Sequence, residues 1–133
     1  MVTTTMCISG MVLIKAGAGV NSSLTAGSIK VGSDFAVDLW IVEAESQINA
    51  RCSYDWTTNY AAAPDATKKI LQQAVSDLAA INCIIYDMSG YTSRFEAESM
   101  INVLRDNYLR ATSLLMNKEK QAFISDVSKG TIL

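Results

Sequence analysis

The fold is decided by residues 65–117, which read DATKKILQQAVSDLAAINCIIYDMSGYTSRFEAESMINVLRDNYLRATSLLMN. Apolar residues recur in both halves of this stretch at spacings of four and three, which is the period of one helix face. The first series is Leu71, Val75, Leu78, Asn82 and Ile85, with Asn82 as its polar member, and the second is Ala97, Ile101, Leu104, Tyr108, Ala111 and Leu115. The pattern predicts two long helices that pack against each other as an antiparallel αα-hairpin.

The turn between the two predicted helices carries signals that end one helix and begin the next. Gly90 stands where a helix end favours a residue that tolerates positive φ, so we expect it to adopt that conformation. Ser93, followed three residues later by Glu96, forms the pattern of a capping box. Residues 87–93 therefore predict a tight connection between helices over 65–86 and 94–117.

A third long helix is predicted over residues 34–52. Ser33 is a good N-cap candidate, and Asp34 places a negative charge in the first turn. One apolar stripe contains Val37, Ile41, Ala44, Ile48 and Cys52, flanked by Trp40, and a second, nearly opposite, contains Phe35, Leu39 and Val42. Two such stripes indicate either a fully buried central helix or a helix that packs inside the subunit on one face and against another molecule on the other.

The segment after this helix, residues 53–65, is predicted to be a loop rich in aromatic residues. It contains Tyr54, Trp56 and Tyr60 and reaches Pro64, the only proline. Amphipathic aromatic residues serve equally well as a lid over the core or as anchors in an interface. Together with the second stripe of the preceding helix, they predict a subunit interface that contains Phe35, Leu39, Val42 and Trp56.

The N-terminal quarter, residues 1–33, predicts one short helix over 5–16 followed by a loop rich in Gly, Ser and Ala. Gly17-Ala18-Gly19 has the spacing of a phosphate-binding loop, but no buried strand precedes it and no helix opens directly after it. Nucleotide binding is therefore not expected. The sequence predicts one domain over the whole chain, with an N-terminal part at residues 1–33, a helical core at residues 34–117 and a tail at residues 118–133.

The C-terminal tail, residues 118–133, loses the helical period but stays apolar. Its apolar residues are Phe123, Ile124, Val127, Ile132 and Leu133. A disordered, solvated end rarely contains so many apolar residues, so we expect this tail to dock on a partner, for example as a strand added to a sheet edge. The alternative is that it folds back over its own helices.

Composition restricts the chemistry of the chain. It has 133 residues, half of them hydrophobic, which suits a single domain with a real core. Histidine is absent, which removes the commonest general base and metal ligand. Cys7, Cys52 and Cys83 are widely spaced and match no metal-binding or disulfide pattern, so we expect reduced, structural thiols and a reducing compartment. No catalytic, metal or cofactor site is predicted.

Charge and hydropathy also bear on the partners. The formal net charge of −2 gives no general attraction for nucleic acid, and no run approaches the roughly 18 apolar residues that a membrane span needs. Glu43 with Glu45, and Glu96 with Glu98, lie two residues apart and are expected on solvated helix faces. Residues 34–55 have a net charge of −4 and residues 105–129 a net charge of +2. Such opposite charges favour head-to-tail association between identical copies.

Five stretches of the helical core carry a resemblance to a known family: IVEAE at 41–45, SYDW at 53–56, AVSDLAA at 74–80, YDMSGYTSR at 86–94 and AESMI at 97–101. Over residues 33–124 the chain resembles the small head-to-tail connector, or adaptor, proteins of tailed bacteriophages. The resemblance implies an all-α subunit that forms a ring of twelve copies beneath the portal at the vertex where DNA leaves the capsid. It implies no catalytic residues, and residues 17–33 have no match in it.

In that role the protein would be a virion component of the head-tail neck, assembled in the host cytoplasm. The tail would bind the portal protein, other surfaces would receive the next tail or nozzle protein, and DNA would pass through the ring without sequence-specific binding. Two alternatives stay open. One is a helical regulatory or scaffold module that binds one protein partner, and the other is a small enzyme that uses Tyr or Cys chemistry.

Overall fold

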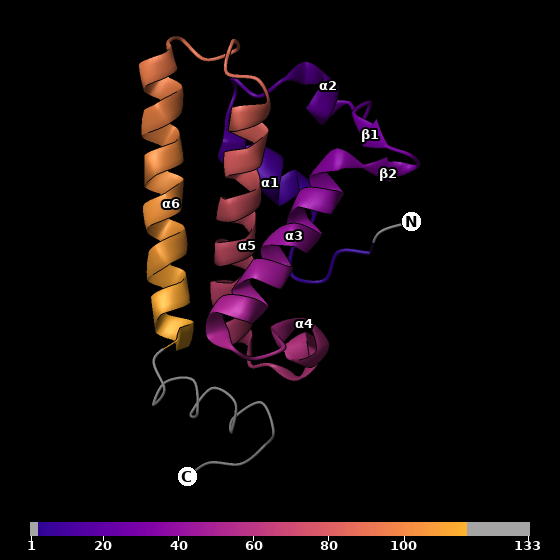
Figure 1. Cartoon of the computed structure of the whole chain (residues 1–133), viewed down its shortest axis with the longest axis vertical. Coiled ribbons are helices and arrows are strands. Elements are labelled where there is room, and N and C mark those ends of the chain that lie inside the picture. Colours follow the sequence, from indigo (N-terminus) through magenta and orange to yellow (C-terminus); the bar gives the residue numbers. More distant parts are fainter. Residues whose placement is uncertain (1–2, 117–133) are drawn as a thin grey trace.

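The computed structural model describes residues 3–116, which are mostly helical (Figure 1). In chain order the elements are α1 (Ser9–Ala16), α2 (Ser22–Thr25), β1 (Lys30–Val31), β2 (Asp34–Phe35), α3 (Ala36–Cys52), α4 (Trp56–Asn59), the 3₁₀ helix η1 (Tyr60–Ala62), α5 (Asp65–Tyr86) and α6 (Arg94–Met116). The helical fold class predicted from the sequence is confirmed in this coarse form. A single small hairpin, β1–β2, is the described part's only sheet.

The two longest helices, α5 and α6, run side by side and are joined by the short turn at residues 87–93 (Figure 1). Helix α5 begins and ends at the predicted residues, and α6 begins at its predicted residue. Ser93 caps α6 because its Oγ accepts a hydrogen bond from the Glu96 N–H at 3.1 Å. The predicted apolar series on α6 is buried at every position except Ile101, which is half-buried.

Helix α5 is the centre of the fold, because α1, α3 and α6 all pack against it. A helix contacted from several sides has no single buried stripe, and the series predicted for α5 is only partly buried for this reason. Leu71 and Val75 are fully buried, Leu78 and Asn82 are half-buried, and Ile85, predicted on the seam, is 55% exposed. Small residues such as Ala74, Ala79 and Ala80 occupy much of the remaining buried surface.

Helix α3 begins two residues later than predicted, because Asp34 and Phe35 belong to strand β2. Ser33 is therefore not an N-cap; it lies in the two-residue turn of the hairpin beside Gly32, whose φ is +64°. The predicted inner stripe of α3 is confirmed, since all five of its residues are buried. A left-handed Ser53, with φ 52°, ends the helix.

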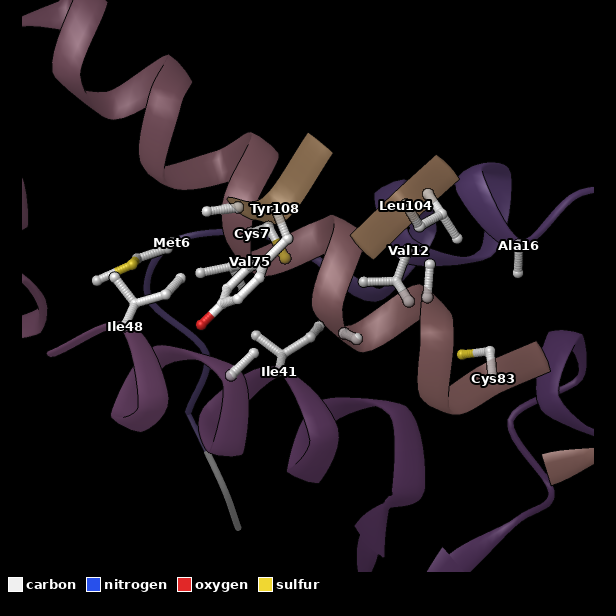
Figure 2. Close-up of a cluster of buried hydrophobic side chains, with 14 of the residues drawn as sticks. Met6, Cys7, Val12, Ala16, Ile41, Ile48, Val75, Cys83, Leu104 and Tyr108 are labelled. Carbon is white, nitrogen blue, oxygen red and sulfur yellow. The ribbon is translucent and has the colours of Figure 1, made fainter. Parts of the chain in front are cut away.

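The hydrophobic core draws on the N-terminal segment as well as on the long helices. Figure 2 shows side chains from four segments converging, with Met6 and Val12 from the N-terminal part, Ile41 from α3, Val75 from α5 and Tyr108 from α6. The predicted N-terminal helix is shorter than expected and covers Ser9–Ala16. Its residues Val12 and Ala16 are nonetheless fully buried, so the N-terminal quarter is an integral part of the fold.

Candidate functional site

A shallow apolar groove runs between α1 and the flank of α6. It has a volume of about 510 Å³ and is lined by Lys15, Phe95, Glu96, Ser99, Met100, Val103 and Leu104. Phe95 is 78% exposed and Val103 58% exposed. Two large apolar side chains so open to water, in the lining of one groove, are typical of a surface that binds a partner. We call this surface the α1–α6 groove.

A buried ion pair lies at the edge of the α1–α6 groove and joins α1 to α5. The Lys15 ammonium is 2.7 Å from Asp77 Oδ1, and the Asp77 side chain is only 2% exposed. Burial raises the pKa of Asp77, and the contact with Lys15 offsets part of that rise. The second carboxylate oxygen of Asp77 is buried without a hydrogen-bond partner within residues 3–116. The pair fixes the position of α1.

The β1–β2 hairpin lies at the opposite edge of the molecule from α6 (Figure 1). Lys30 pairs with Phe35 and Val31 with Asp34 across the two strands. Val31, next to the turn, is 65% exposed. The sequence contained a signal for this hairpin in Val31-Gly32-Ser33-Asp34, since Gly-Ser between two short β-prone runs predicts a two-residue turn. The N-cap interpretation of Ser33 hid that signal.

The residues predicted to form a subunit interface do not share one surface. Phe35, Leu39 and Val42 are half-buried and so retain some surface for a partner. Trp56 is fully buried, and its inclusion in the interface is corrected by the structure. The backbone N–H of Trp56 donates to Asn49 Oδ1 at 2.9 Å, and the centroid of its ring lies 4.5 Å from that of Tyr54, which fixes Trp56 as a lid over the core of its own chain.

The three cysteines are buried and form no disulfide. Burial raises the pKa of the Cys7 and Cys83 thiols to about 12, and in Cys7 the neighbouring Glu45 raises it further. Burial also raises the pKa of Cys52, against a lowering contribution from the neighbouring Trp56 side chain. A thiol with so high a pKa is a poor nucleophile at neutral pH. The side chains therefore act as small apolar groups in the core.

Glu45 is a buried carboxylate, which corrects the prediction that it lies on a solvated face. Its side chain is 3% exposed, and Oε2 accepts hydrogen bonds from the N–H groups of Thr5 and Met6, both at 2.9 Å. The neighbouring Glu43 is exposed as predicted. Glu45 thus attaches the N-terminal segment to α3 through two charge-assisted hydrogen bonds.

The Gly-rich loop after α1 contacts the turn between α5 and α6. Tyr91 Oη donates a buried hydrogen bond to the Ala16 carbonyl oxygen at 2.6 Å, and Asn21 Nδ2 donates to Asp87 Oδ2 at 2.7 Å. The prediction that Gly90 adopts a positive φ is wrong, because the described glycines with positive φ are Gly17, Gly27 and Gly32. Gly90 is needed instead because the backbone of Gly19 lies directly against it.

The predicted portal-binding residues, Phe123, Ile124, Val127, Ile132 and Leu133, lie outside the described residues. Within residues 3–116, no group of three His, Cys, Asp or Glu side chains is placed to hold a metal ion. None of the helices there combines the length and apolar character that crossing a bilayer requires.

Exposed apolar side chains lie on the hairpin and on α6, and also on α1 at Ile14 and on α5 at Ile85, while the buried polar groups hold segments together. Comparisons with protein-family models, with curated proteins and with solved structures found no match.

Proposed function

We propose that this chain is a structural subunit that assembles with copies of itself into a ring and connects a phage portal to the tail. The observation that carries the proposal is the position of its exposed apolar side chains. Val31 lies on the hairpin at one edge of the molecule, and Phe95 and Val103 lie on α6 at the other (Figure 1). A closed ring needs two different complementary surfaces on each subunit, as these edges provide.

Buried polar groups take part in contacts that hold the fold together, which favours a structural role over a catalytic one. Asp77 is paired with Lys15, Glu45 accepts two backbone N–H groups, and the Tyr91 hydroxyl donates to a backbone carbonyl. Each of these contacts joins segments that are far apart in the sequence. A catalytic group instead needs access to a substrate and a pKa suited to proton transfer near neutral pH.

In the proposed ring, the α5–α6 pair acts as a long antiparallel αα-hairpin, and the tail of residues 118–133 extends from it to the portal protein. The ring contains twelve copies, lies in the head-tail neck of the virion and surrounds the DNA exit path without reading its sequence. Another surface receives the tail or nozzle protein. These assignments rest on the resemblance to connector proteins and on the apolar composition of the tail.

The proposal is tested by the assembly state of the purified chain, alone and mixed with a portal protein. Sedimentation velocity and negative-stain electron microscopy should show rings, either in the free protein at high concentration or on the portal. Particles with a rotational symmetry that matches the portal would support the proposal. A chain that stays monomeric in both experiments would overturn it, and a monomer that binds a single helical partner with 1:1 stoichiometry would favour the scaffold function, because the α1–α6 groove suits a helix.

A further inference from the structure

We propose that adjacent copies join by inserting the β1–β2 hairpin of one copy into the α1–α6 groove of the next. This inference rests on the proposed ring and specifies its subunit contact. The occupant of the groove is therefore a second copy of this chain, and the residue at the centre of the contact is Val31.

The hairpin has the properties of an inserted element. Its strands are two residues long, and a hairpin of that size is not stable by itself. Its base is anchored, because the Ala36 N–H donates to the Ile29 carbonyl oxygen at 2.9 Å and both Ile29 and Phe35 pack against the core. Its tip nevertheless presents a β-branched apolar side chain, Val31, that is 65% exposed.

The α1–α6 groove matches this tip in chemistry. Phe95, Met100, Val103 and Leu104 supply apolar walls, and the volume of about 510 Å³ exceeds what one valine needs. Burial of Val31 between Phe95 and Val103 would remove three exposed apolar side chains from water in a single contact, which is the main source of favourable free energy in association.

Charges on the two surfaces are also complementary. Lys30, next to Val31, is exposed and makes no ion pair with any described residue. Glu96 is an exposed carboxylate in the lining of the groove. When Val31 enters the groove, the long Lys30 side chain can reach Glu96, and a pair at the rim favours this register over others.

The placement of the two surfaces sets the type of contact. The hairpin and α6 are at opposite edges of the molecule (Figure 1). Each copy therefore gives a hairpin to one neighbour and receives a hairpin from the other, which is a heterologous contact.

The test uses Val31→Asp, which disables the hairpin, and Val103→Asp, which disables the groove. A charge placed in an apolar contact should weaken association at least about 100-fold, so each variant alone should sediment as a monomer. An equimolar mixture should form a 1:1 heterodimer and nothing larger, because only one intact hairpin and one intact groove can meet. Leu109→Asp, on α6 but outside the groove and 38% exposed, is the matched control and should still form rings.

Two further measurements guard against variants that fail to fold. Circular dichroism should show wild-type helix content in all three chains. In addition, a chain with both Val31→Cys and Val103→Cys should give a ladder of covalent oligomers on oxidation, since the native thiols are buried. Lys30→Glu should weaken assembly, and adding Glu96→Lys in the same chain should restore it.

The outcomes separate this inference from the proposed function. The hairpin contact would be overturned, and the ring left in place, if Val31→Asp or Val103→Asp still formed rings. The same would follow if the chain with Val31→Cys and Val103→Cys formed rings but gave no covalent ladder on oxidation. A wild-type chain that never assembles would overturn the ring and the contact together.

Discussion

The backbone of Gly19 lies so close to Gly90 that a methyl group on Gly90 would overlap the Gly19 carbonyl oxygen. The approach is tight on both sides, because a Cβ on Gly19 would lie 2.6 Å from the Tyr91 ring. Two glycines 71 positions apart in the sequence thus allow the N-terminal loop to seat against the turn between α5 and α6.

Gly90→Ala should lower the free energy of unfolding by about 2–3 kcal/mol, because the new Cβ forces the N-terminal loop away from the turn. Gly10→Ala is the control: Gly10 is in α1, and its Cβ would meet only Ile8 Cδ1, at 3.9 Å. It should raise stability by about 0.5–1 kcal/mol through helix propensity. Urea denaturation measures both, and an unchanged Gly90→Ala midpoint would show that the close approach is absent in solution.

Glu45→Ala should lower the free energy of unfolding by about 2–3 kcal/mol, because the buried Met6 N–H and the partly buried Thr5 N–H lose their charged acceptor. Glu43→Ala, two residues away on the exposed face of α3, should change it by less than about 0.5 kcal/mol. Limited proteolysis adds a local readout, since only Glu45→Ala should make residues 3–8 sensitive to cleavage. Equal effects of the two substitutions would contradict the buried role of Glu45.

Lys15→Met should cost about 3 kcal/mol at pH 7, because it leaves the Asp77 carboxylate buried without its counter-charge. The pKa of Asp77 is already raised by burial, so the folded chain binds a proton more readily than the unfolded chain does. Without Lys15 that pKa rises further. The difference in the free energy of unfolding between the wild type and Lys15→Met should therefore shrink as the pH falls from 7 to 5.

Asp77→Asn is the matched control for this pair. Lys15 is 29% exposed and can turn into solvent when the carboxylate is lost. Asp77→Asn should therefore lower the free energy of unfolding by less than about 1 kcal/mol, which is a smaller loss than that of Lys15→Met. Chemical denaturation of both variants at the two pH values decides the matter. A loss in Lys15→Met that does not change with pH, or a larger loss in Asp77→Asn, would contradict this account.

Removal of residues 123–133 should leave helix content and melting temperature nearly unchanged and abolish binding to the portal. The reason is that the buried apolar residues of the described part, Leu115 near the end of α6 included, form one hydrophobic cluster with each other. Circular dichroism and co-sedimentation with purified portal protein measure the two effects. A truncated chain that unfolds would show that the tail packs on its own helices, and one that still binds the portal would show that the anchor lies elsewhere.

The parts of the fold that could be predicted are those specified by local signals. Ser93 precedes α6 as its cap, and apolar residues that recur every three or four positions run along both α5 and α6, which are 22 and 23 residues long. The inner stripe of α3 was predicted for the same reason. Each of these features depends on residues within one or two helical turns.

The parts that could not be predicted depend on contacts between distant segments. Glu45 lies beside the inner stripe of α3, four residues after Ile41, whereas Glu43 lies on the far side of the helix. The partners of Glu45, the N–H groups of Thr5 and Met6, are 40 and 39 positions away and have no local signal. The burial of Trp56 likewise depends on how its segment folds over the core, since the same aromatic residue would suit an interface equally well. The α1–α6 groove has walls on two helices nearly 80 residues apart and has no signature in either.

The attachment of the N-terminal segment also sets an order of events during synthesis. This segment leaves the ribosome first, yet its partners include Asp77, Asp87 and Tyr91, up to 75 positions later in the chain. The α5–α6 pair can form from neighbouring residues as soon as both helices have emerged, whereas contacts between distant segments form slowly. The nascent chain must therefore hold Met6, Val12 and the other apolar N-terminal side chains without all of their final partners until α5 and the turn after it have been made. Transiently exposed apolar surface of this kind makes an incomplete chain prone to aggregate.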